Sequence, residues 1–338
     1  MANISDYCSK KIQALSFVAS YMVVLIHANP GLPLHRGWGG VYQIIVQDGI
    51  CGFAVPFFFI VTGYFFMNRY DASFLWWNAA IRKRVRSLMI PYFLWCCLAI
   101  IIGRMTSSVW PDWTEAFGIT TITPANPPLW YIKLVFVMGI VSPILIWILN
   151  NVTTRKWLLL LLGIAILLLL SMDILLIKTV GRSVLYFGLG IGIARGLFGK
   201  QFDINWISKI LIVCWIGAVL GELILLKRYR LYWNKAWLYM PLISAPLIWF
   251  GYDVLYNRIR FLRSMVSNAR FLDVCKTSFF IYCSHAVLMM IAWSWYKPDS
   301  VCNVFVFGTC VFVICLVCAM MIRRASSRCY SLLVGGRL

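Results

Sequence analysis

The chain has 338 residues, of which 62% are hydrophobic and only 12% are charged, and its mean hydropathy is +0.83. This composition excludes an ordinary soluble protein and indicates that most of the chain lies in lipid. The net charge of +20 does not indicate nucleic acid, because Lys and Arg occur in short blocks between apolar runs and not along one aromatic-interleaved face. We therefore expect an all-α, polytopic transmembrane helix bundle with no nucleic-acid partner.

About ten apolar runs have the length of a transmembrane helix, since about 20 apolar residues cross roughly 30 Å of hydrocarbon. The predicted spans are residues 12–28, 49–67, 88–104, 129–149, 157–177, 183–198, 206–226, 236–252, 278–296 and 301–322. No loop between them is long enough for a soluble domain, so residues 1–338 are expected to form one transmembrane domain. The first helix is expected to be retained, because its apolar run lacks a small-residue cleavage pattern.

The basic residues predict the orientation, because cytoplasmic loops carry the excess of Lys and Arg. With both termini in the cytoplasm, about 21 basic residues face inward and about 9 face outward. One loop disagrees, since four cations would then lie outside: Lys227, Arg228, Arg230 and Lys235. A re-entrant segment within residues 206–252 would remove this conflict.

His27 is the first ionisable residue inside a predicted span, and such residues in lipid are candidates for function. It lies about 22 Å along the helix from Ile12 at 1.5 Å per residue, which places it toward the outer leaflet. An imidazole titrates near neutral pH, so it can take a proton from an alcohol and return it to a leaving group, as acyl transfer requires. The alternative is a helix-end histidine that only hydrogen-bonds a carbonyl or interfacial water.

Other polar residues in apolar runs have less specific interpretations. His285 indicates a polar bundle interior, and Glu222 is expected to neutralise a cation such as Lys227. Most cysteines fall in apolar runs and are expected to be buried thiols, and the Cys315/Cys318 spacing lacks the second pair that a metal site needs. The glycine-rich stretch 188–196 is expected to pack helices through small residues.

The densest cluster of positive charge lies just before the third predicted span and comprises Arg82, Lys83, Arg84 and Arg86. Guanidinium groups bind phosphates bidentately, so a nucleotide-bearing donor such as an acyl coenzyme A is one natural ligand of this basic loop. Anionic lipid headgroups, or a charge bias that only sets orientation, are the alternatives.

Several motifs in a fixed order resemble a known family. They are Val23–His27 at the end of the first helix, Val55–Tyr64 in the second, the basic loop running into Ile90–Tyr92, Pro128–Lys133, and Ser278–Tyr282 before His285. Together they resemble the membrane-integral acyltransferase family 3, mostly bacterial O-acyltransferases that modify surface glycans. The architecture of about ten helices with cytoplasmic termini is similar to that of the family.

The resemblance implies transfer of an acyl group, commonly acetyl, from cytosolic acyl-CoA to a sugar hydroxyl of a cell-surface or lipid-linked glycan. It implies location in the bacterial inner membrane, and the cysteine spacing leaves no metal expected. His27 takes the role of the family's helix-one histidine, while Lys83 and Arg86 have the spacing of its Arg-x-x-Arg motif. The family usually carries an Arg about eleven residues before the histidine. Ser16 stands there, so Lys11 or Lys10 supplies that charge or the role is lost.

The expected substrate pocket comprises Trp130, Tyr131, Lys133 and His285. Aromatic faces suit a sugar, and a lysine inside the membrane needs an anionic partner. The predicted outer loop, residues 105–128, either folds over a pocket mouth or forms an interfacial aromatic belt.

A transporter or flippase for a lipid-linked sugar or small anion is the alternative function, in which the same histidine and basic residues would line a proton-coupled path. The sequence favours it less, because it shows no internal repeat and no matched pair of broken helices. A membrane interaction protein is a third hypothesis, supported by the missing Arg.

Overall fold

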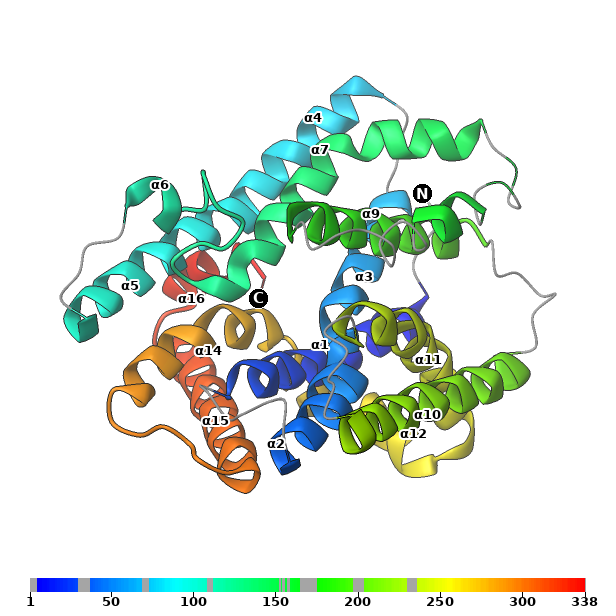
Figure 1. The fold of residues 1–338 in the computed structure, drawn as a ribbon. Helices are drawn as coiled ribbons and strands as arrows, with labels where there is room; N and C mark the ends of the chain where they lie inside the picture. Colours follow the sequence, from blue (N-terminus) through cyan, green and yellow to red (C-terminus); the bar gives the residue numbers. More distant parts are fainter. Residues whose placement is uncertain are drawn as a thin grey trace. The chain divides into compact units, whose positions relative to one another are not determined.

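The structure is a computed structural model that describes residues 5–29, 37–68, 73–107, 112–151, 153, 156, 159–164, 175–196, 204–229 and 236–337. Every regular element within these ranges is a helix, which confirms the all-α prediction (Figure 1). The chain forms two compact units. The first comprises Met1–Met22, Gly31–Tyr70 and Ile144–Asp273, and the second comprises Val23–Pro30, Asp71–Pro143 and Val274–Leu338.

The first unit contains most of α1 (Asp6–His27) and the last residues of α7. Its other elements are α2 (Gly37–Tyr42), the π-helix η1 (Gln43–Ile50), η2 (Cys51–Phe53), α3 (Ala54–Asn68), α9 (Leu175–Ala194), α10 (Ile204–Tyr229), α11 (Ala236–Arg258), α12 (Arg260–Ser267) and most of α13 (Ala269–Cys275). Helices α3 and α9 pack backbone to backbone at two glycines. A Cβ would lie 2.1 Å from the Phe187 oxygen at Gly63 and 2.0 Å from the Ile60 oxygen at Gly190, so the predicted packing through small residues is confirmed there.

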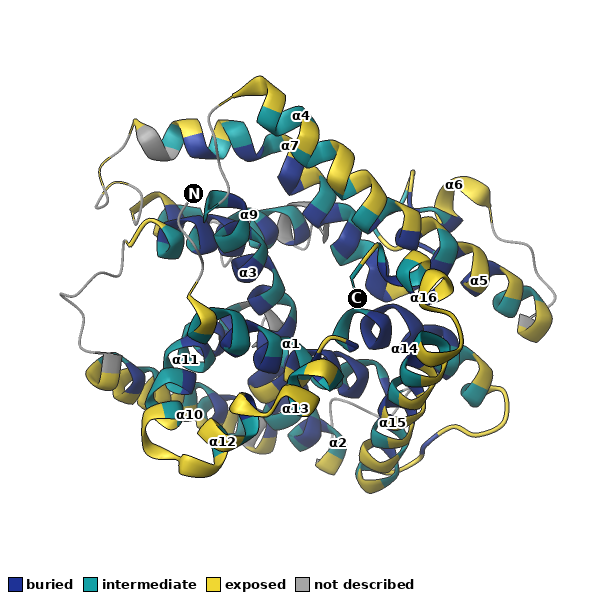
Figure 2. Ribbon diagram, turned by 180° about the vertical axis from the view of Figure 1, so that it is seen from behind, coloured by how far each residue is buried: buried dark blue, intermediate teal, exposed yellow. Residues whose placement is uncertain are grey.

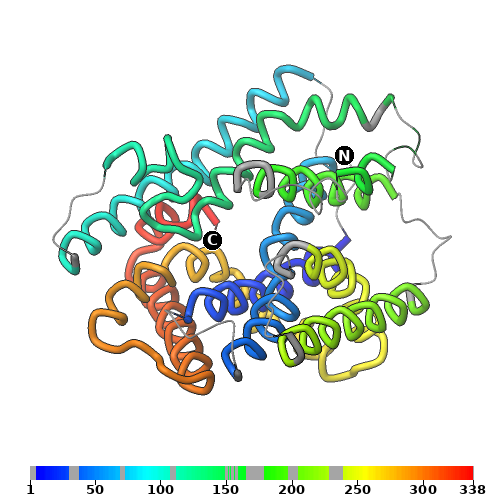
Figure 3. Tube along the Cα trace, in the orientation of Figure 1, coloured from blue at the N-terminus to red at the C-terminus, as the bar shows by residue number. Residues whose placement is uncertain are grey.

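The second unit contains the end of α1 and most of α7 (Trp130–Asn150). Its other elements are α4 (Phe74–Arg84), the π-helix η3 (Val85–Met89), α5 (Ile90–Ser107), α6 (Trp113–Ala116), η4 (Pro127–Leu129), α14 (Ser278–Trp293), α15 (Val301–Ala325) and α16 (Ser327–Val334). Helix α14 packs on α5 and α15. The C-terminal helix α16 lies beside α5, as the trace in Figure 3 also shows.

In the described ranges, six helical segments are long and apolar enough to cross a membrane: Asp6–His27, Trp38–Asn68, Phe74–Thr106, Pro127–Ile148, Asn205–Lys227 and Val301–Ala325. The pair α13 and α14, bent by 44°, makes a seventh if it is one span. The predicted run 183–198 falls in α9, whose apolar part Thr179–Ala194 is shorter, and the run 236–252 falls in α11 with Pro241 and Pro246 inside it. Run 157–177 lies mostly outside the described residues, so the total of about ten spans and the orientation of the termini stay predictions.

The basic segment is a helix and not the loop expected from its charge. Residues Phe74–Thr106 run as one helix through α4, η3 and α5. The apolar run of α5 continues directly from the charged residues, and Ser73 caps the start by accepting the Trp76 backbone N–H at 3.1 Å. No residue of α4 is buried, and its exposed positions are visible in Figure 2.

The cysteines are free thiols, and those in apolar runs divide into two groups. Cys96, Cys283 and Cys315 are buried, as expected, whereas Cys97, Cys214, Cys310 and Cys318 are exposed. The expectation is wrong for these four, because an apolar helix in lipid has outward faces as hydrophobic as its inward one. Within the part of the chain that the structure describes, no three His, Cys, Asp or Glu side chains gather as metal ligands.

Candidate active site

His27 is the last residue of α1, and within the described residues one of its two ring nitrogens makes a hydrogen bond. Its Nδ1 lies 2.8 Å from the Val23 carbonyl oxygen, one turn back. A carbonyl only accepts hydrogen bonds, so Nδ1 carries the proton and Nε2 of the neutral ring carries the lone pair. The side chain is half-buried, and its ring lies against a second imidazole.

His285, on α14, supplies that second imidazole. The two ring centroids are 5.2 Å apart, with the planes at 55°. His285 is 0% exposed, its Nδ1 lies 3.2 Å from the Ile281 oxygen, and its Nε2 has no hydrogen-bond partner within the described residues. Buried polar atoms are rarely left unpaired, so this nitrogen is a candidate for contact with substrate. The structure thus brings together two histidines from distant parts of the sequence.

Helix α15 holds the end of α1 in place through Gly308. A Cβ at this position would come 2.9 Å from Leu25 Cδ2 and 3.0 Å from Ala28 Cβ. The missing side chain therefore permits the two helices to approach closely beside His27.

A row of aromatic rings continues from the histidine pair. The rings of His285 and Tyr282 are 6.1 Å apart, and Tyr131 meets Tyr282 edge-on at 5.8 Å. The Tyr282 hydroxyl donates to the carbonyl oxygen of Pro128, and Asn126 Nδ2 donates to the Cys283 oxygen at 3.0 Å. These bonds fix α14 against the segment before α7. The predicted pocket residue Tyr131 therefore contacts the ring that lies next to His285.

Lys133, also expected in the pocket, binds a loop instead of an anionic group. Its Nζ donates to the carbonyl oxygens of Gly118 and Thr121, at 2.7 and 2.8 Å. The Tyr92 hydroxyl donates to the Phe117 oxygen at 2.7 Å, so this loop packs on α5. The expectation of an anionic partner is wrong among the described residues, because two backbone carbonyls satisfy the ammonium. At the start of the loop, hydrogen bonds from Thr114 lower the pKa of Asp112.

Trp130 is the first residue of α7 and is half-buried. Within the described ranges, the ring contacts of the two imidazoles are with each other and with Tyr282. Of the expected pocket set, His285 and Tyr131 thus both adjoin the Tyr282 ring.

The basic residues divide into exposed cations and one packed cation. Arg82, Lys83 and Arg86 are exposed, whereas Arg84 is half-buried. Its side chain lies on α7, where a Cβ at Gly139 would come 2.8 Å from Arg84 Cδ. These residues belong to the same unit as the histidine pair, and within the described ranges His27 makes no hydrogen bond or ring contact with them.

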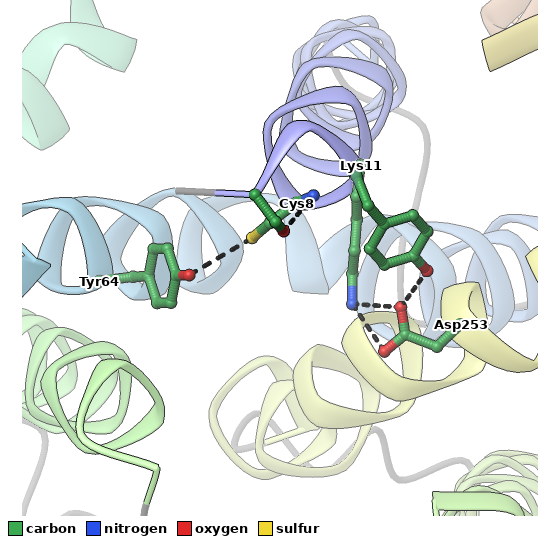
Figure 4. Close-up of polar contacts among 6 residues, drawn as sticks. Cys8, Lys11, Tyr64 and Asp253 are labelled. Carbon is green, nitrogen blue, oxygen red and sulfur yellow. Dashed lines mark hydrogen bonds and ion pairs between the residues drawn. The ribbon is translucent and has the colours of Figure 1, made fainter. Parts of the chain in front are cut away.

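In the first unit, α1 carries a buried lysine with a partner that the sequence analysis missed. Lys11 is 3% exposed, and its Nζ lies 2.8 and 2.9 Å from the two oxygens of Asp253 on α11 (Figure 4). The Tyr7 hydroxyl donates to the same carboxylate at 2.5 Å, and the Trp249 ring faces Nζ at 4.2 Å. Lys10 instead pairs with exposed Asp6 at 2.6 Å. Lys11 is therefore the buried cation of helix one.

Glu222 does not pair with Lys227 as expected. It is 1% exposed in α10 and accepts a hydrogen bond from the Tyr239 hydroxyl of α11, while Lys227 is exposed. The Tyr239 hydroxyl meets one oxygen of this carboxylate, and the other, Oε2, is buried without a hydrogen-bond partner among the described residues.

The sequence comparison identifies the family. The family model of acyltransferase family 3, described as an acyltransferase domain, matches residues 10–324 of the 338. No curated protein and no solved structure matches the chain. Because the match covers most of the chain and includes His27, His285 and at least six helices that can span a membrane, the chain is a multi-pass membrane acyltransferase that belongs to acyltransferase family 3.

Proposed function

We propose that this protein transfers an acyl group, in the simplest case acetyl, from cytosolic acyl-CoA to a hydroxyl of a cell-surface or lipid-linked glycan in the bacterial inner membrane. The observation that carries the proposal is the free Nε2 of His27 beside a second imidazole whose Nε2 is also unpaired within the described residues. Two adjacent imidazoles, each with a ring nitrogen able to accept a hydrogen bond, suit an acceptor that offers neighbouring hydroxyls, as a sugar does.

In this mechanism His27 is the general base. Its Nε2 takes the proton of the acceptor hydroxyl as the oxygen bonds to the thioester carbonyl carbon. The carbon–sulfur bond then breaks, and the imidazolium returns the proton to the departing thiolate. The products are the glycan ester and free coenzyme A. His285 accepts a hydrogen bond from a neighbouring hydroxyl and orients the acceptor.

The basic segment is proposed to bind the donor phosphates. Arg82, Lys83 and Arg86 are exposed on one helix, so their cationic groups are accessible to a phosphate. Arg84, whose side chain packs at Gly139 of α7, is proposed to offer a further cationic group to these phosphates.

The test uses purified protein in nanodiscs with radiolabelled acetyl-CoA, scoring thiol release and label on an added glycan. His27→Asn keeps a donor for the Val23 carbonyl but cannot accept a proton, so we expect turnover to disappear while the protein stays folded. Arg86→Ala should raise the KM for acetyl-CoA, whereas Arg263→Ala, which removes an exposed arginine of α12, should not.

Two results would contradict the proposal. A wild-type protein that neither binds nor consumes acetyl-CoA or longer acyl-CoA would remove the donor assignment. A His27→Asn variant with normal turnover would remove the general-base role.

A further inference from the structure

The C-terminal segment folds back onto the helix that carries the basic residues, although it lies beyond the residues matched by the family. The Trp95 indole Nε1 donates to the Leu333 oxygen at 3.1 Å, which fixes α16 to α5. Gly335 follows with φ +66°, and a Cβ there would come 2.2 Å from the Ser87 oxygen. Only glycine fits this turn against η3 without strain.

Arg337 ends this segment in a defined position. Its Nη1 donates to the oxygens of Ser87 and Val334, at 2.6 and 2.7 Å. The guanidinium carbon lies 3.9 Å from the centroid of the Phe279 ring. Two hydrogen bonds and a cation–π contact therefore hold the side chain in a single orientation.

The other edge of the guanidinium is unused. Within the described residues, Nε and Nη2 of Arg337 make no hydrogen bond, and no carboxylate pairs with the group. The side chain is half-buried and its unused nitrogens are not among the fully buried atoms. Nε and one Nη form the edge with which arginine binds a phosphate bidentately.

Arg337 contacts two elements that the proposed donor would have to reach: the basic segment, and α14, the helix that carries His285. Ser87, which accepts its hydrogen bond, directly follows Arg86 in the π-helix η3. Phe279 and His285 are six positions apart on α14, about 9 Å at 1.5 Å per residue. The flexible pantetheine arm of coenzyme A can span that rise.

We propose that Arg337 binds a phosphate of the acyl-CoA donor, together with the basic residues beside Ser87. This inference rests on the proposed donor. A lipid headgroup presents the same phosphate chemistry, so the test must separate the two sources.

The experiment measures equilibrium binding of radiolabelled coenzyme A to the full chain in phosphatidylcholine nanodiscs. Arg337→Gln should weaken binding about tenfold to a hundredfold, since a bidentate charge-assisted contact is lost. The KM for acetyl-CoA should rise in parallel with little change in kcat. Arg337→Lys keeps the charge without the fork and should recover part of the affinity.

Two further variants guard against a general loss of structure. Arg328→Gln removes the same charge from an exposed position on α16 and should bind coenzyme A normally. Gly335→Ala leaves Arg337 in the chain but pushes the turn away from Ser87, so it should weaken binding like Arg337→Gln.

Each of three other outcomes would overturn a specific part of the proposal. Normal coenzyme A binding by Arg337→Gln rejects the role of Arg337 and leaves the donor assignment intact. A wild-type protein that binds no coenzyme A rejects the donor assignment, and the inference falls with it. If Arg337→Gln instead loses only bound phosphatidylglycerol, measured by native mass spectrometry, the phosphate belongs to lipid and not to the donor.

Discussion

Lys11 and His27 both lie on α1, but their surroundings differ in what they leave unpaired. The ammonium of Lys11 meets both oxygens of Asp253 and an aromatic face, so the charge is matched inside its own unit. His27 uses one ring nitrogen for its helix carbonyl, and the other, on the ring beside His285, has no hydrogen-bond partner in the described part of the chain. The comparison teaches that burial of a polar residue in a membrane helix is not sufficient evidence of chemistry. An unpaired atom in a polar cluster is the more specific sign.

The largest expected effect is that of replacing His27. His27→Ala should lower turnover about 10²- to 10⁴-fold, the usual contribution of a general base. Thermal unfolding should change little, because the ring makes one hydrogen bond, to its own helix. Free imidazole added to His27→Ala should restore part of the acetyl transfer measured with labelled acetyl-CoA. A strongly lowered unfolding temperature would instead make His27 a structural residue and break the comparison.

The next largest effect is expected when the Lys11–Asp253 ion pair is broken, and it is a loss of folding stability. Asp253→Asn leaves the Lys11 ammonium buried without its counter-charge, which should cost about 3 kcal/mol or more. The measurement is thermal unfolding in detergent. Asp6→Asn is the matched control, because it breaks the exposed Lys10 pair, where the expected loss is below about 1 kcal/mol. Equal stability of the two variants would show that the buried pair is not what joins α1 to α11.

A smaller effect is expected at the second imidazole. His285→Phe keeps an aromatic ring against Tyr282 but removes the unpaired Nε2. Loss of one hydrogen bond to the acceptor should raise the KM for the glycan roughly three- to tenfold. The KM for acetyl-CoA should stay unchanged. If the donor KM rises instead, His285 belongs to the donor path and not to acceptor binding.

The smallest effect is expected when the ion pair is replaced as a whole. Lys11→Met combined with Asp253→Leu removes both charges at similar volume, and such replacements are often neutral or stabilising. We expect unfolding temperature and acetyl transfer close to those of the wild type. A folded double variant that no longer uses acetyl-CoA would show that Lys11 supplies the helix-one cation of the family. The Lys11–Asp253 pair would then be needed for activity and not only for stability.

Long apolar runs and His27 were readable in the sequence because each depends on local composition. Seven of the predicted runs coincide with helices, or a bent pair, long enough to span. The basic segment was misjudged as a loop, since charge reports solvent exposure and not backbone conformation, and the structure continues it as a helix. The expectation of an anionic partner for Lys133 was wrong among the described residues. The Lys133 ammonium instead donates to a loop carbonyl fifteen residues earlier in the chain.

Partners far apart in the chain were beyond sequence reasoning. Asp253 is separated from Lys11 by 242 positions, and Arg337 from Ser87 by 250. No periodicity or motif joins such residues, although a buried lysine on helix one does signal that some carboxylate must be near.

The sequence by itself determined the solvent, the helical class and the family, because apolar composition and ordered motifs are properties of contiguous residues. Only the tertiary structure decided which polar atoms are satisfied. It pairs Lys11 with Asp253, sets His285 beside His27 and places Arg337 on Ser87. The physical reason is that hydrogen bonds and ion pairs form within a few ångströms, and only the folded packing of helices brings distant residues that close.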